Sequence, residues 1–463
     1  MAGEARYQGQ RIVILGLARQ GVALAQYLAG QGARVVVSDL QPATSPRLAA
    51  NLAALGNLTI EYVLGGHPLS LLDGADGLCL SGGVSADLPI VREARRRHIG
   101  LSNDTQVFLE ACPAGVLTVG ITGSAGKTTT TTLAGRMLSG ALASGGRTVW
   151  VGGNIGNPLI SDTDRMRPGD VAVMELSSFQ LEITTLSTQV AAVLNITPNH
   201  LDRHGTMEAY TAAKSRLLLY QPEESVAILG RDDPGAWALA PLVRARLACF
   251  SSAGPVEAGA CLRGPTVVFR WDGREQEVCA VSDIRLRGWH NVVNVLAACA
   301  ISGAAGAPPE AMRSAIAGFT GVEHRLELVA ERGGVKWYND SIASAPERVM
   351  AAIRSFDEPL VLLLGGRDKK LPWEGLAQLA KTRVKHLVLF GEARQLIEEA
   401  LRAAGVEPAR VTVCGRLEEA VGAAARHAGP GDVALLSPGC TSFDEFQDFA
   451  ERGDRFKEWV NVL

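Results

Sequence analysis

Short apolar runs that alternate with helical stretches recur along this chain of 463 residues. The first example is RIVILGLARQGVALAQYLAGQGARVVVSD, residues 11–39, which combines two apolar runs with a glycine-rich turn and a helical pattern between them. Continuous apolar strands joined by helices are typical of parallel sheets that are covered on both faces. The sequence therefore predicts an α/β fold built on doubly wound sheets.

The alternating pattern starts again near Val107 and near Gly321. A chain of this length is too long for one core and has room for about three domains of ordinary size. We therefore expect three domains, at residues 1–106, 107–320 and 321–463, of which the first and third are Rossmann-like. After Gly230 the runs become shorter and alternate, as in PTVVFRW, which predicts a β-rich insertion.

Composition and charge exclude several classes of function. Hydrophobic residues make up 47% of the chain and charged residues 20%, as in soluble globular enzymes, and a net charge of −3 gives no strong field for nucleic acid or anionic membranes. The eight cysteines form no CxxC pair, which disfavours zinc and favours a reducing cytoplasm. The start MAGEARYQGQ has no signal-peptide core, and no apolar run reaches the roughly 18 residues of a membrane span. We expect a cytoplasmic protein, monomeric, without nucleic-acid or membrane partners.

The segment GITGSAGKTT, residues 120–129, is a phosphate-binding loop of shortened spacing. Gly123 and Gly126 would let backbone N–H groups point inward. Lys127 could neutralise phosphate, and Thr128 could reach a magnesium ion. An apolar run precedes the loop and a helical pattern follows it, so the central domain is predicted to be a P-loop-type, ATP-binding domain. A purely structural turn is the less favoured alternative.

The glycine-rich turn of residues 11–39 departs from the dinucleotide fingerprint. Gly16 and Gly21 are present, but Ala18 stands where the fingerprint has its middle glycine, and its methyl group would crowd a pyrophosphate. Ordinary NAD binding is therefore disfavoured. A turn that needs glycine only for steric reasons and a pocket for another nucleotide remain equally open.

Polar residues follow the later apolar runs. Glu175 ends one run, where a buried carboxylate needs a cation or donors, and a magnesium ion at the phosphate loop would serve. Further along the chain come Asn199, His200, Asp202, Arg203, His204 and Lys214. Taken singly, each has an ordinary alternative, such as a surface histidine or a lysine that extends to solvent.

These motifs in this order resemble the Mur ligases of peptidoglycan synthesis. The matching segments are the GSAGKT loop, GGNIG, ELSSFQLE, NHLDRHG, a lysine on the next helix, GWHNVVN, HRLE, NDS, LLGGRDKKLPW and LSPGCTSFDEF. They span essentially the whole chain, and their shared order is much more specific than any one of them. The DNPR stretch of the branch that adds a diamino acid is absent, which favours the branch that adds D-glutamate.

The resemblance implies an ATP-dependent amide ligase of cell-wall precursor synthesis. ATP would convert the carboxylate of UDP-N-acetylmuramoyl-L-alanine to an acyl phosphate, and the amine of D-glutamate would then displace phosphate. Closure of the third domain over the second would keep water from the acyl phosphate. The partners would be these small molecules alone. The alternatives are another Mur ligase, a folate polyglutamate ligase, an NAD oxidoreductase and a nucleotide-dependent switch without catalysis.

The resemblance also assigns residues to ATP and to two magnesium ions. For ATP they are Gly123, Ser124, Ala125, Gly126, Lys127, Thr128, Thr129, Asn291, Asn294, His324, Arg325 and Asp340. For the metal ions they are Thr128, Glu175, His200 and Lys214. Because an ammonium group cannot ligate a cation, Lys214 would be carbamylated by CO2. The catalytic residues would be Lys127, Asn154, His200, Lys214 and Arg325.

The substrates are assigned in the same way. UDP, rather than NAD, would contact Arg19, Gln20, Asp39 and Leu40. The muramoyl-alanine part would contact Asn154, Ser177 and Gln180, and D-glutamate would contact Ser344, Lys369, Ser442 and Phe449. Two positions depart from the family pattern: Ile342 replaces a lysine of one branch, and SGGV at residues 81–84 replaces the more usual Ser-Pro-Gly.

Overall fold

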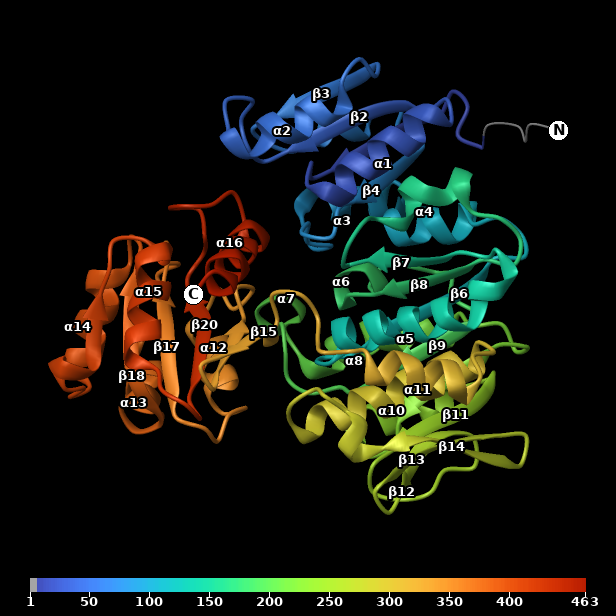
Figure 1. The fold of residues 1–463 in the computed structure, drawn as a ribbon. Helices are drawn as coiled ribbons and strands as arrows, with labels where there is room; N and C mark the ends of the chain where they lie inside the picture. The colour runs from blue at the N-terminus through green and yellow to red at the C-terminus, as the bar shows by residue number, and fades with distance from the viewer. Residues whose placement is uncertain (1–5) are drawn as a thin grey trace. The chain divides into compact units, whose positions relative to one another are not determined.

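The computed structural model describes residues 6–463, except for the side chains of Arg47, Ser144 and Asp202. Its three sheets occupy residues 11–102, 117–280 and 327–439, and mostly parallel strands confirm the predicted α/β class (Figure 1). Contacts divide the chain into two compact units. The first unit extends to Arg285 and includes Trp289–Phe319, and the second comprises Leu286–Gly288 and Thr320–Leu463.

The first sheet is parallel throughout, with the strand order β3-β2-β1-β4-β5. Its strands are β1 (Arg11–Leu15), β2 (Arg34–Asp39), β3 (Ile60–Leu64), β4 (Gly77–Leu80) and β5 (Gly100–Ser102). The connecting helices are α1 (Arg19–Gly30), α2 (Pro46–Leu55), η1 (Leu69–Leu72) and α3 (Pro89–Arg96). The order reverses between β1 and β4, and ligands of doubly wound sheets bind at the carboxyl ends of the strands at such a point.

The second sheet has nine strands in the order β14-β13-β12-β11-β10-β9-β6-β8-β7. They are β6 (Leu117–Thr122), β7 (Val149–Gly153), β8 (Val171–Glu175), β9 (Val190–Val193), β10 (Val226–Gly230), β11 (Arg246–Ser251), β12 (Gly259–Arg263), β13 (Thr266–Trp271) and β14 (Arg274–Ala280). In this sheet β12 pairs antiparallel with β13 and β13 pairs antiparallel with β14, and the other pairs are parallel. The predicted β-rich segment after Gly230 therefore extends this sheet, and its last three strands, β12 to β14, form an antiparallel meander.

The helices of this part of the chain surround the second sheet. They are α4 (Asp104–Ala111), α5 (Lys127–Leu142), η2 (Ala143–Gly145), η3 (Leu159–Arg165), α6 (Ser178–Leu181), α7 (Leu201–His204), α8 (Met207–Leu219), α9 (Pro234–Trp237), η4 (Ala240–Leu242), η5 (Val281–Asp283), α10 (Trp289–Ala304) and α11 (Pro309–Ala317). Among the described residues, no helix is both long enough and apolar enough to cross a membrane.

The third sheet has the order β15-β16-β20-β17-β18-β19, and only β15 runs antiparallel to its neighbour. Its strands are β15 (Glu327–Arg332), β16 (Val335–Asn339), β17 (Leu360–Gly365), β18 (Val384–Phe390), β19 (Val411–Val413) and β20 (Val433–Gly439). Its helices are α12 (Pro346–Ile353), α13 (Glu374–Arg383), α14 (Arg394–Ala403), η6 (Pro408–Arg410), α15 (Leu417–His427) and α16 (Phe449–Asn461).

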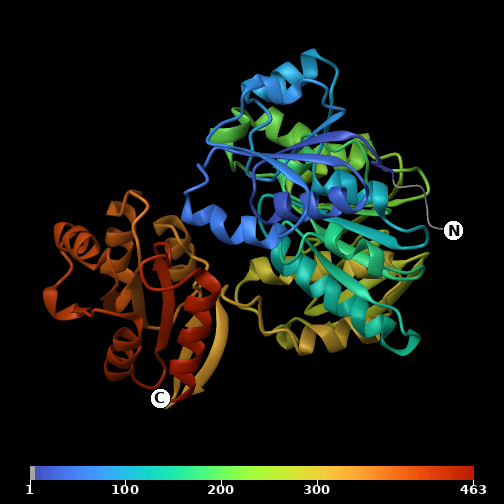
Figure 2. The ribbon, with the colours of Figure 1, turned by 90° about the horizontal axis from the view of Figure 1, so that it is seen from above.

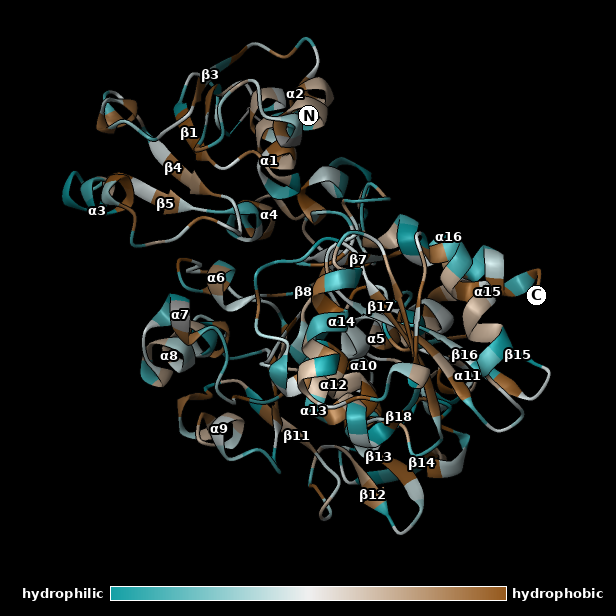
Figure 3. Cartoon of the chain, turned by 90° about the vertical axis from the view of Figure 1, so that its left-hand side faces the viewer, coloured by the Kyte–Doolittle hydropathy of each residue, from teal (hydrophilic) through white to brown (hydrophobic). Residues whose placement is uncertain are grey.

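Helices cover both faces of the third sheet, as the continuous apolar strands require. Leu362 and Leu364 of β17 pack with residues of α12, α13 and α14, whereas Val361 and Leu363 pack with residues of α15 and α16. Figure 2 shows orange and red helices on both sides of this sheet. Figure 3 shows the hydrophobic colour along strands such as β17, while the helices carry both colours. Each fully buried leucine or valine contributes about 1.5–3 kcal/mol to folding, so the two apolar faces of the strands hold the helices in place.

The segment Leu286–Gly288 is part of the second unit, although α10 of the first unit follows it directly. Arg287 donates hydrogen bonds of 2.8 and 2.7 Å to the two carboxylate oxygens of Glu358, and one of 2.6 Å to the hydroxyl of Tyr338. Its guanidinium also lies 5.0 Å from the ring centre of Phe356. This bidentate ion pair fixes the segment to the second unit.

Candidate functional site

The phosphate loop predicted from the sequence connects β6 to α5. Gly126 precedes Lys127, the first residue of α5, and has a left-handed backbone with φ of 79°. A Cβ atom there would lie 2.3 Å from Oδ1 of Asn294 on α10, so glycine is required both by the backbone and by the space. The N-terminus of a 16-residue helix thus faces the loop, and the helix dipole and its unpaired N–H groups favour an anion there.

Asn195, just after β9, holds this loop in shape. Its side chain accepts a hydrogen bond of 2.8 Å from the N–H of Ala125 and donates one of 3.1 Å to the carbonyl of the same residue. Its own carbonyl accepts from the N–H of Ser124 at 3.0 Å. Asn195 could not be identified from the sequence, where its only signal is a polar residue at the end of an apolar strand.

Lys127 keeps its ammonium group at the loop. Its Nζ donates a hydrogen bond of 2.9 Å to the carbonyl of Gly123 and lies 3.5 Å from the carbonyl oxygen of Ser124. A cation beside backbone N–H groups is the arrangement that neutralises bound phosphate in P-loop proteins. The predicted phosphate-binding residues therefore lie together.

Three predicted residues meet beside the loop: Thr128 on α5, Glu175 at the end of β8 and Asn154 just after β7. Glu175, at the end of β8, is only 2% exposed. Its Oε2 accepts a hydrogen bond of 2.8 Å from the hydroxyl of Thr128, and its Oε1 accepts one of 2.8 Å from the side-chain amide of Asn154. The carboxyl ends of the parallel strands β7 and β8 place these side chains at one edge of the sheet.

The oxygen atoms of Thr128 and Glu175 fit magnesium. Magnesium is held in proteins by one or two such oxygens together with water and substrate phosphates. No group of three His, Cys, Asp or Glu residues that could hold a metal ion occurs in the described part of the chain. A magnesium ion here would therefore depend on the phosphates of a bound nucleotide for the rest of its ligands.

Lys214 lies on α8 and is buried, with 1% of its surface exposed, so it is not a lysine that extends to solvent. Its Nζ donates to the hydroxyl of Thr122 at 3.2 Å and to the carbonyl of Gly123 at 3.0 Å, and it lies 4.7 Å from the ring centre of Tyr210. Burial, helped by the charge of Lys127, lowers the pKa of Lys214 from 10.5 to about 7. A large fraction of the amine is therefore neutral and nucleophilic near neutral pH.

The loop NHLDRHG forms an aromatic cluster around Phe179. His200 is exposed, has a left-handed backbone with φ of 53°, and meets the Phe179 ring edge-on at 5.1 Å. His204 stacks on the same ring at 5.2 Å and shares a hydrogen bond of 2.9 Å with the hydroxyl of Ser178. The side chain of Asp202 is outside the described residues.

Gln180 lies inside the protein and is only 1% exposed. Its Oε1 accepts from the N–H and the hydroxyl of Ser177, which caps α6, and its Nε2 donates to both carboxylate oxygens of Asp104 at 3.3 and 3.2 Å. Burial raises the pKa of Asp104 to about 6, although the Gln180 amide opposes this. The Gln180 side chain thus braces the segment after Glu175. Asp104 itself could not be identified from the sequence.

The residues predicted for UDP fall into two groups. Asp39 and Gln20 brace the backbone: Asp39 accepts from the N–H of Leu17 at 2.8 Å, and Gln20 accepts from that of Gly82 at 2.9 Å. Arg19 and Leu40 are exposed near these loops, Leu40 with 61% of its surface. The guanidinium of Arg19 also reaches the carbonyl of Asn154 at 3.5 Å.

The two asparagines of α10 lie at the phosphate loop. Asn294 donates a hydrogen bond of 2.9 Å to Oδ1 of Asn291, and its own Oδ1 lies against Gly126. This pair lies inside the helix rather than serving as its cap, because α10 begins at Trp289. The predicted adenine residues are thus next to the predicted phosphate residues.

The second unit holds the remaining predicted residues. Asp340 accepts from the N–H of Leu326 at 3.3 Å and from the hydroxyl of Ser437 at 2.7 Å, and burial raises its pKa to about 7. Lys369 donates a hydrogen bond of 2.9 Å to the hydroxyl of Ser344, and partial burial lowers its pKa. Of the other residues predicted for D-glutamate, Ser442 is buried and Phe449 is 39% exposed.

Comparison with known proteins gives matches over almost the whole chain. Residues 10–102 match the model of the Mur ligase MurD-like N-terminal domain, residues 121–302 the Mur ligase middle domain, and residues 324–440 the Mur ligase glutamate ligase domain. A relative from Symbiobacterium thermophilum is 41% identical over 456 residues, which cover 98% of each chain. The chain belongs to the Mur ligase family. A second relative, from Syntrophus aciditrophicus, is 41% identical over 460 residues, also 98% of each chain.

Solved structures of other Mur ligases share the fold of this Mur ligase. The UDP-N-acetylmuramate-alanine ligase MurC of Thermotoga maritima has a TM-score of 0.57 at 18% identity, with 98% of this chain and 99% of that chain covered. MurF of Acinetobacter baumannii has a TM-score of 0.56 at 18% identity, with 99% and 93% covered. At these identities the likeness shows the fold alone. The three sheets are those of the Mur ligase architecture.

Proposed function

We propose that this Mur ligase adds D-glutamate to UDP-N-acetylmuramoyl-L-alanine, using ATP, as a step of peptidoglycan precursor synthesis in the cytoplasm. The observation that carries the proposal is the match at 41% identity over 98% of the chain to relatives named "UDP-N-acetylmuramoylalanine--D-glutamate ligase". The geometry of the phosphate loop supports the ATP-dependent part. We expect the working enzyme to be a monomer.

The ATP phosphates are proposed to lie on the loop Gly123–Thr129. Its N–H groups, the α5 dipole and the Lys127 ammonium provide positive charge, and Asn291 and Asn294 would face the adenine. Thr128 and Glu175 would hold a magnesium ion, which when bound neutralises charge between the phosphates and the acceptor carboxylate. Arg325 would serve the phosphates and Asp340 the ribose, which requires the second unit to approach the nucleotide.

Lys214 is proposed to be carbamylated. Its neutral amine would attack CO2, forming a C–N bond and releasing one proton, so that a cationic residue becomes an anionic one. Its burial and its pKa of about 7 support this, since only the neutral amine reacts. The carbamate and His200 would be ligands for a second magnesium ion.

The two parts of UDP-N-acetylmuramoyl-L-alanine are proposed to bind to the first unit, and D-glutamate to the second. Arg19, Gln20, Asp39 and Leu40 would bind UDP, while Asn154, Ser177 and Gln180 would position the muramoyl-alanine carboxylate. The contact between Arg19 and Asn154 supports a continuous path between these two groups. D-glutamate would be held by Ser344, Lys369, Ser442 and Phe449, where the Lys369 ammonium offers charge to a carboxylate.

The reaction would proceed in two balanced steps. A carboxylate oxygen of UDP-N-acetylmuramoyl-L-alanine attacks the γ-phosphorus, and ADP leaves. The amine of D-glutamate then attacks the acyl carbon, phosphate leaves with the P–O–C oxygen, and the amine loses a proton. Lys127 and the loop N–H groups would stabilise charge in the first step, and closure of the second unit would exclude water in the second.

Phosphate release tests this function directly. The chain is incubated with ATP, magnesium, UDP-N-acetylmuramoyl-L-alanine and either D- or L-glutamate. We expect release with D-glutamate and none above background with L-glutamate. Release that depends on neither amino acid would contradict the proposal, and release with a diamino acid instead would assign the chain to another branch of the family.

A further inference from the structure

Arg325 lies in a strained turn between two residues with left-handed backbones. His324 has φ of 62° and Leu326 has φ of 44°, and neither is glycine. Such conformations persist only where surrounding contacts enforce them, and they concentrate at functional sites. The direction of the Arg325 side chain therefore depends on whatever holds its two neighbours.

Backbone contacts hold the turn on both sides of Arg325. The N–H of His324 donates to Oε2 of Glu327 at 2.9 Å, and the carbonyl of His324 accepts from the N–H of Ile342 at 3.1 Å. The N–H of Leu326 donates to Oδ1 of Asp340 at 3.3 Å. Two carboxylates thus fix the turn, and the position of Glu327 matters as much as that of Asp340.

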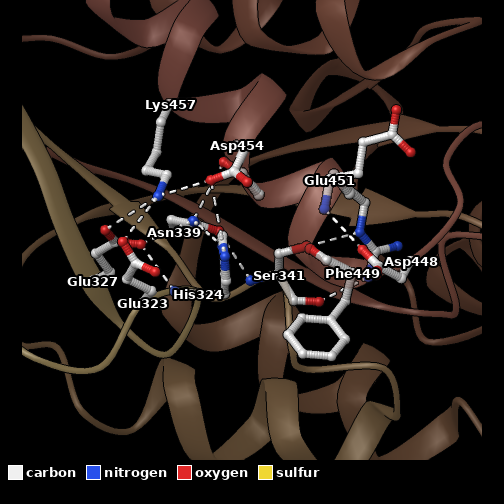
Figure 4. Close-up of polar contacts among 12 residues, drawn as sticks. Glu323, His324, Glu327, Asn339, Ser341, Asp448, Phe449, Glu451, Asp454 and Lys457 are labelled. Atoms are coloured by element: carbon white, nitrogen blue, oxygen red, sulfur yellow. Dashed lines mark hydrogen bonds and ion pairs between the residues drawn. The ribbon is translucent and has the colours of Figure 1, made fainter. Parts of the chain in front are cut away.

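The imidazole of His324 fits against α16, the C-terminal helix (Figure 4). Its Nδ1 shares a hydrogen bond of 3.0 Å with the side-chain amide of Asn339, and the same amide donates to Oε2 of Glu327 at 3.1 Å. A Cβ atom on Gly453 of α16 would lie 2.1 Å from Nδ1 of His324, so the ring occupies the space that glycine leaves. The turn therefore packs directly against α16.

Lys457, one turn further along α16, faces three carboxylates (Figure 4). Its Nζ lies 2.9 Å from Asp454, 3.6 Å from Glu327 and 3.8 Å from Glu323. Partial burial opposes its charge, yet the hydrogen bond to Asp454 and the other carboxylates raise the pKa of Lys457. Without this ammonium, three carboxylates would repel one another, and Glu327 would be driven away from His324 and Asn339.

We propose that Lys457 is a positioning residue for Arg325: it holds Glu327 in place, Glu327 and Asn339 hold the strained His324 turn, and the turn sets the direction of the Arg325 side chain. The inference rests on the proposed function, in which Arg325 serves the ATP phosphates. It adds that nucleotide affinity is set partly by a helix that itself provides none of the proposed ATP residues.

The test uses the full chain and compares Lys457→Met with Arg325→Ala and the double variant. We expect Lys457→Met to raise the KM for ATP about tenfold, because a misplaced Arg325 would lose one hydrogen bond to a charged phosphate. The KM for D-glutamate should stay within twofold. Because Lys457 acts through Arg325, the double variant should be no weaker for ATP than Arg325→Ala alone. Lys457→Arg should restore most of the ATP affinity.

Arg455→Met provides the matched control, since Arg455 lies on the same helix and forms an exposed ion pair with Glu458. It should leave every KM unchanged. Lys457→Gln is measured in parallel, so that the result does not depend on the folding of one variant. The proposal is overturned if the Lys457 variants lower the melting temperature with no change in KM for ATP, or if the losses from Lys457→Met and Arg325→Ala simply add.

The same variants are also compared by direct titration of ATP with magnesium. If the unmodified chain binds ATP but forms no amide with D-glutamate, the proposed function fails, while the binding data still test Lys457. If amide forms and the Lys457 variants bind ATP as tightly as the unmodified chain, the inference fails and the function stands.

Discussion

The hydroxyl of Thr128 donates a hydrogen bond of 2.8 Å to Oε2 of Glu175, so the first turn of α5 is joined to the end of β8 beside the phosphate loop. Both oxygens are hard ligands, and the carboxylate is buried without a cationic side chain among its hydrogen-bond partners above. A bound magnesium ion would compensate the negative charge of this buried carboxylate.

Glu175→Gln removes the negative charge of the carboxylate while keeping the size of the side chain. We expect kcat for phosphate release to fall about 100-fold or more, the usual effect of removing one preorganised electrostatic group, and the magnesium requirement to increase. A magnesium titration of the initial rate measures both. Asp162→Asn, which removes a carboxylate paired with exposed Arg165, should have no effect. An unchanged magnesium dependence in Glu175→Gln would contradict the metal assignment.

Lys214→Arg separates a carbamate from a simple positive charge. Arginine stays protonated and cannot react with CO2, so we expect ligation to be lost in Lys214→Arg as fully as in Lys214→Ala, while ATP binding remains. In the unmodified protein, carbamate formation should increase as the pH rises through about 7, because the amine then becomes neutral. Carbon-13 NMR with labelled CO2 would detect the carbamate. An active Lys214→Arg variant would disprove it.

Asp104 predicts a pH dependence of stability. Burial raises its pKa in the folded protein from 3.8 to about 6, so the folded state holds a proton that the unfolded state has already lost between these two values. By linkage, the contribution of Asp104 is most favourable below pH 4 and is lost as the pH rises through about 6.

Asp104→Asn, which does not titrate, should therefore remove this slope. Denaturant unfolding of both proteins between pH 4 and 8 measures the difference in the free energy of unfolding, which should shift in favour of the variant as the pH rises. The replacement also disturbs the pair with Gln180, but that loss is much less dependent on pH. A constant difference across the range would show that Asp104 ionises normally.

Lys369→Met tests the amino-acid site. Loss of an ammonium that pairs with a substrate carboxylate should raise the KM for D-glutamate about 10- to 100-fold and leave the KM for ATP nearly unchanged. Lys370→Met is the matched control, because Lys370 is the exposed neighbour. Equal effects of the two variants would indicate a general role of local charge instead of a specific contact.

Local sequence patterns were sufficient to predict the strands of the sheets and the position of the phosphate loop. The apolar runs of β1 and β17, and the turn before α5, depend mainly on residues near them in sequence. The roles of Asn195 and Asp104 depend on partners far along the chain, Ala125 and Gln180, and no periodicity connects such pairs. The burial of Lys214 could not be predicted either, because it follows from how α8 packs and not from the sequence of its own segment.

The resemblance to the Mur ligases predicted individual site residues that local sequence patterns could not. It selected Asn294 from many polar residues, and this side chain lies at the phosphate loop. Its assignment of Gln180 as a substrate contact stays a prediction, and the side chain is also hydrogen-bonded within the protein to Ser177 and Asp104. A family motif preserves a position, but it does not separate residues that touch a ligand from those that support them.

The segment around Arg287 has a practical consequence for dissecting this protein into fragments. Because Leu286–Gly288 belongs to the second unit, the chain passes between the units three times, after Arg285, Gly288 and Phe319. A fragment that starts at residue 320 would lack the guanidinium that pairs with Glu358 and covers Tyr338 and Phe356. No single cut yields both units intact, and a gene for an isolated C-terminal unit would have to supply Arg287 on an added N-terminal extension.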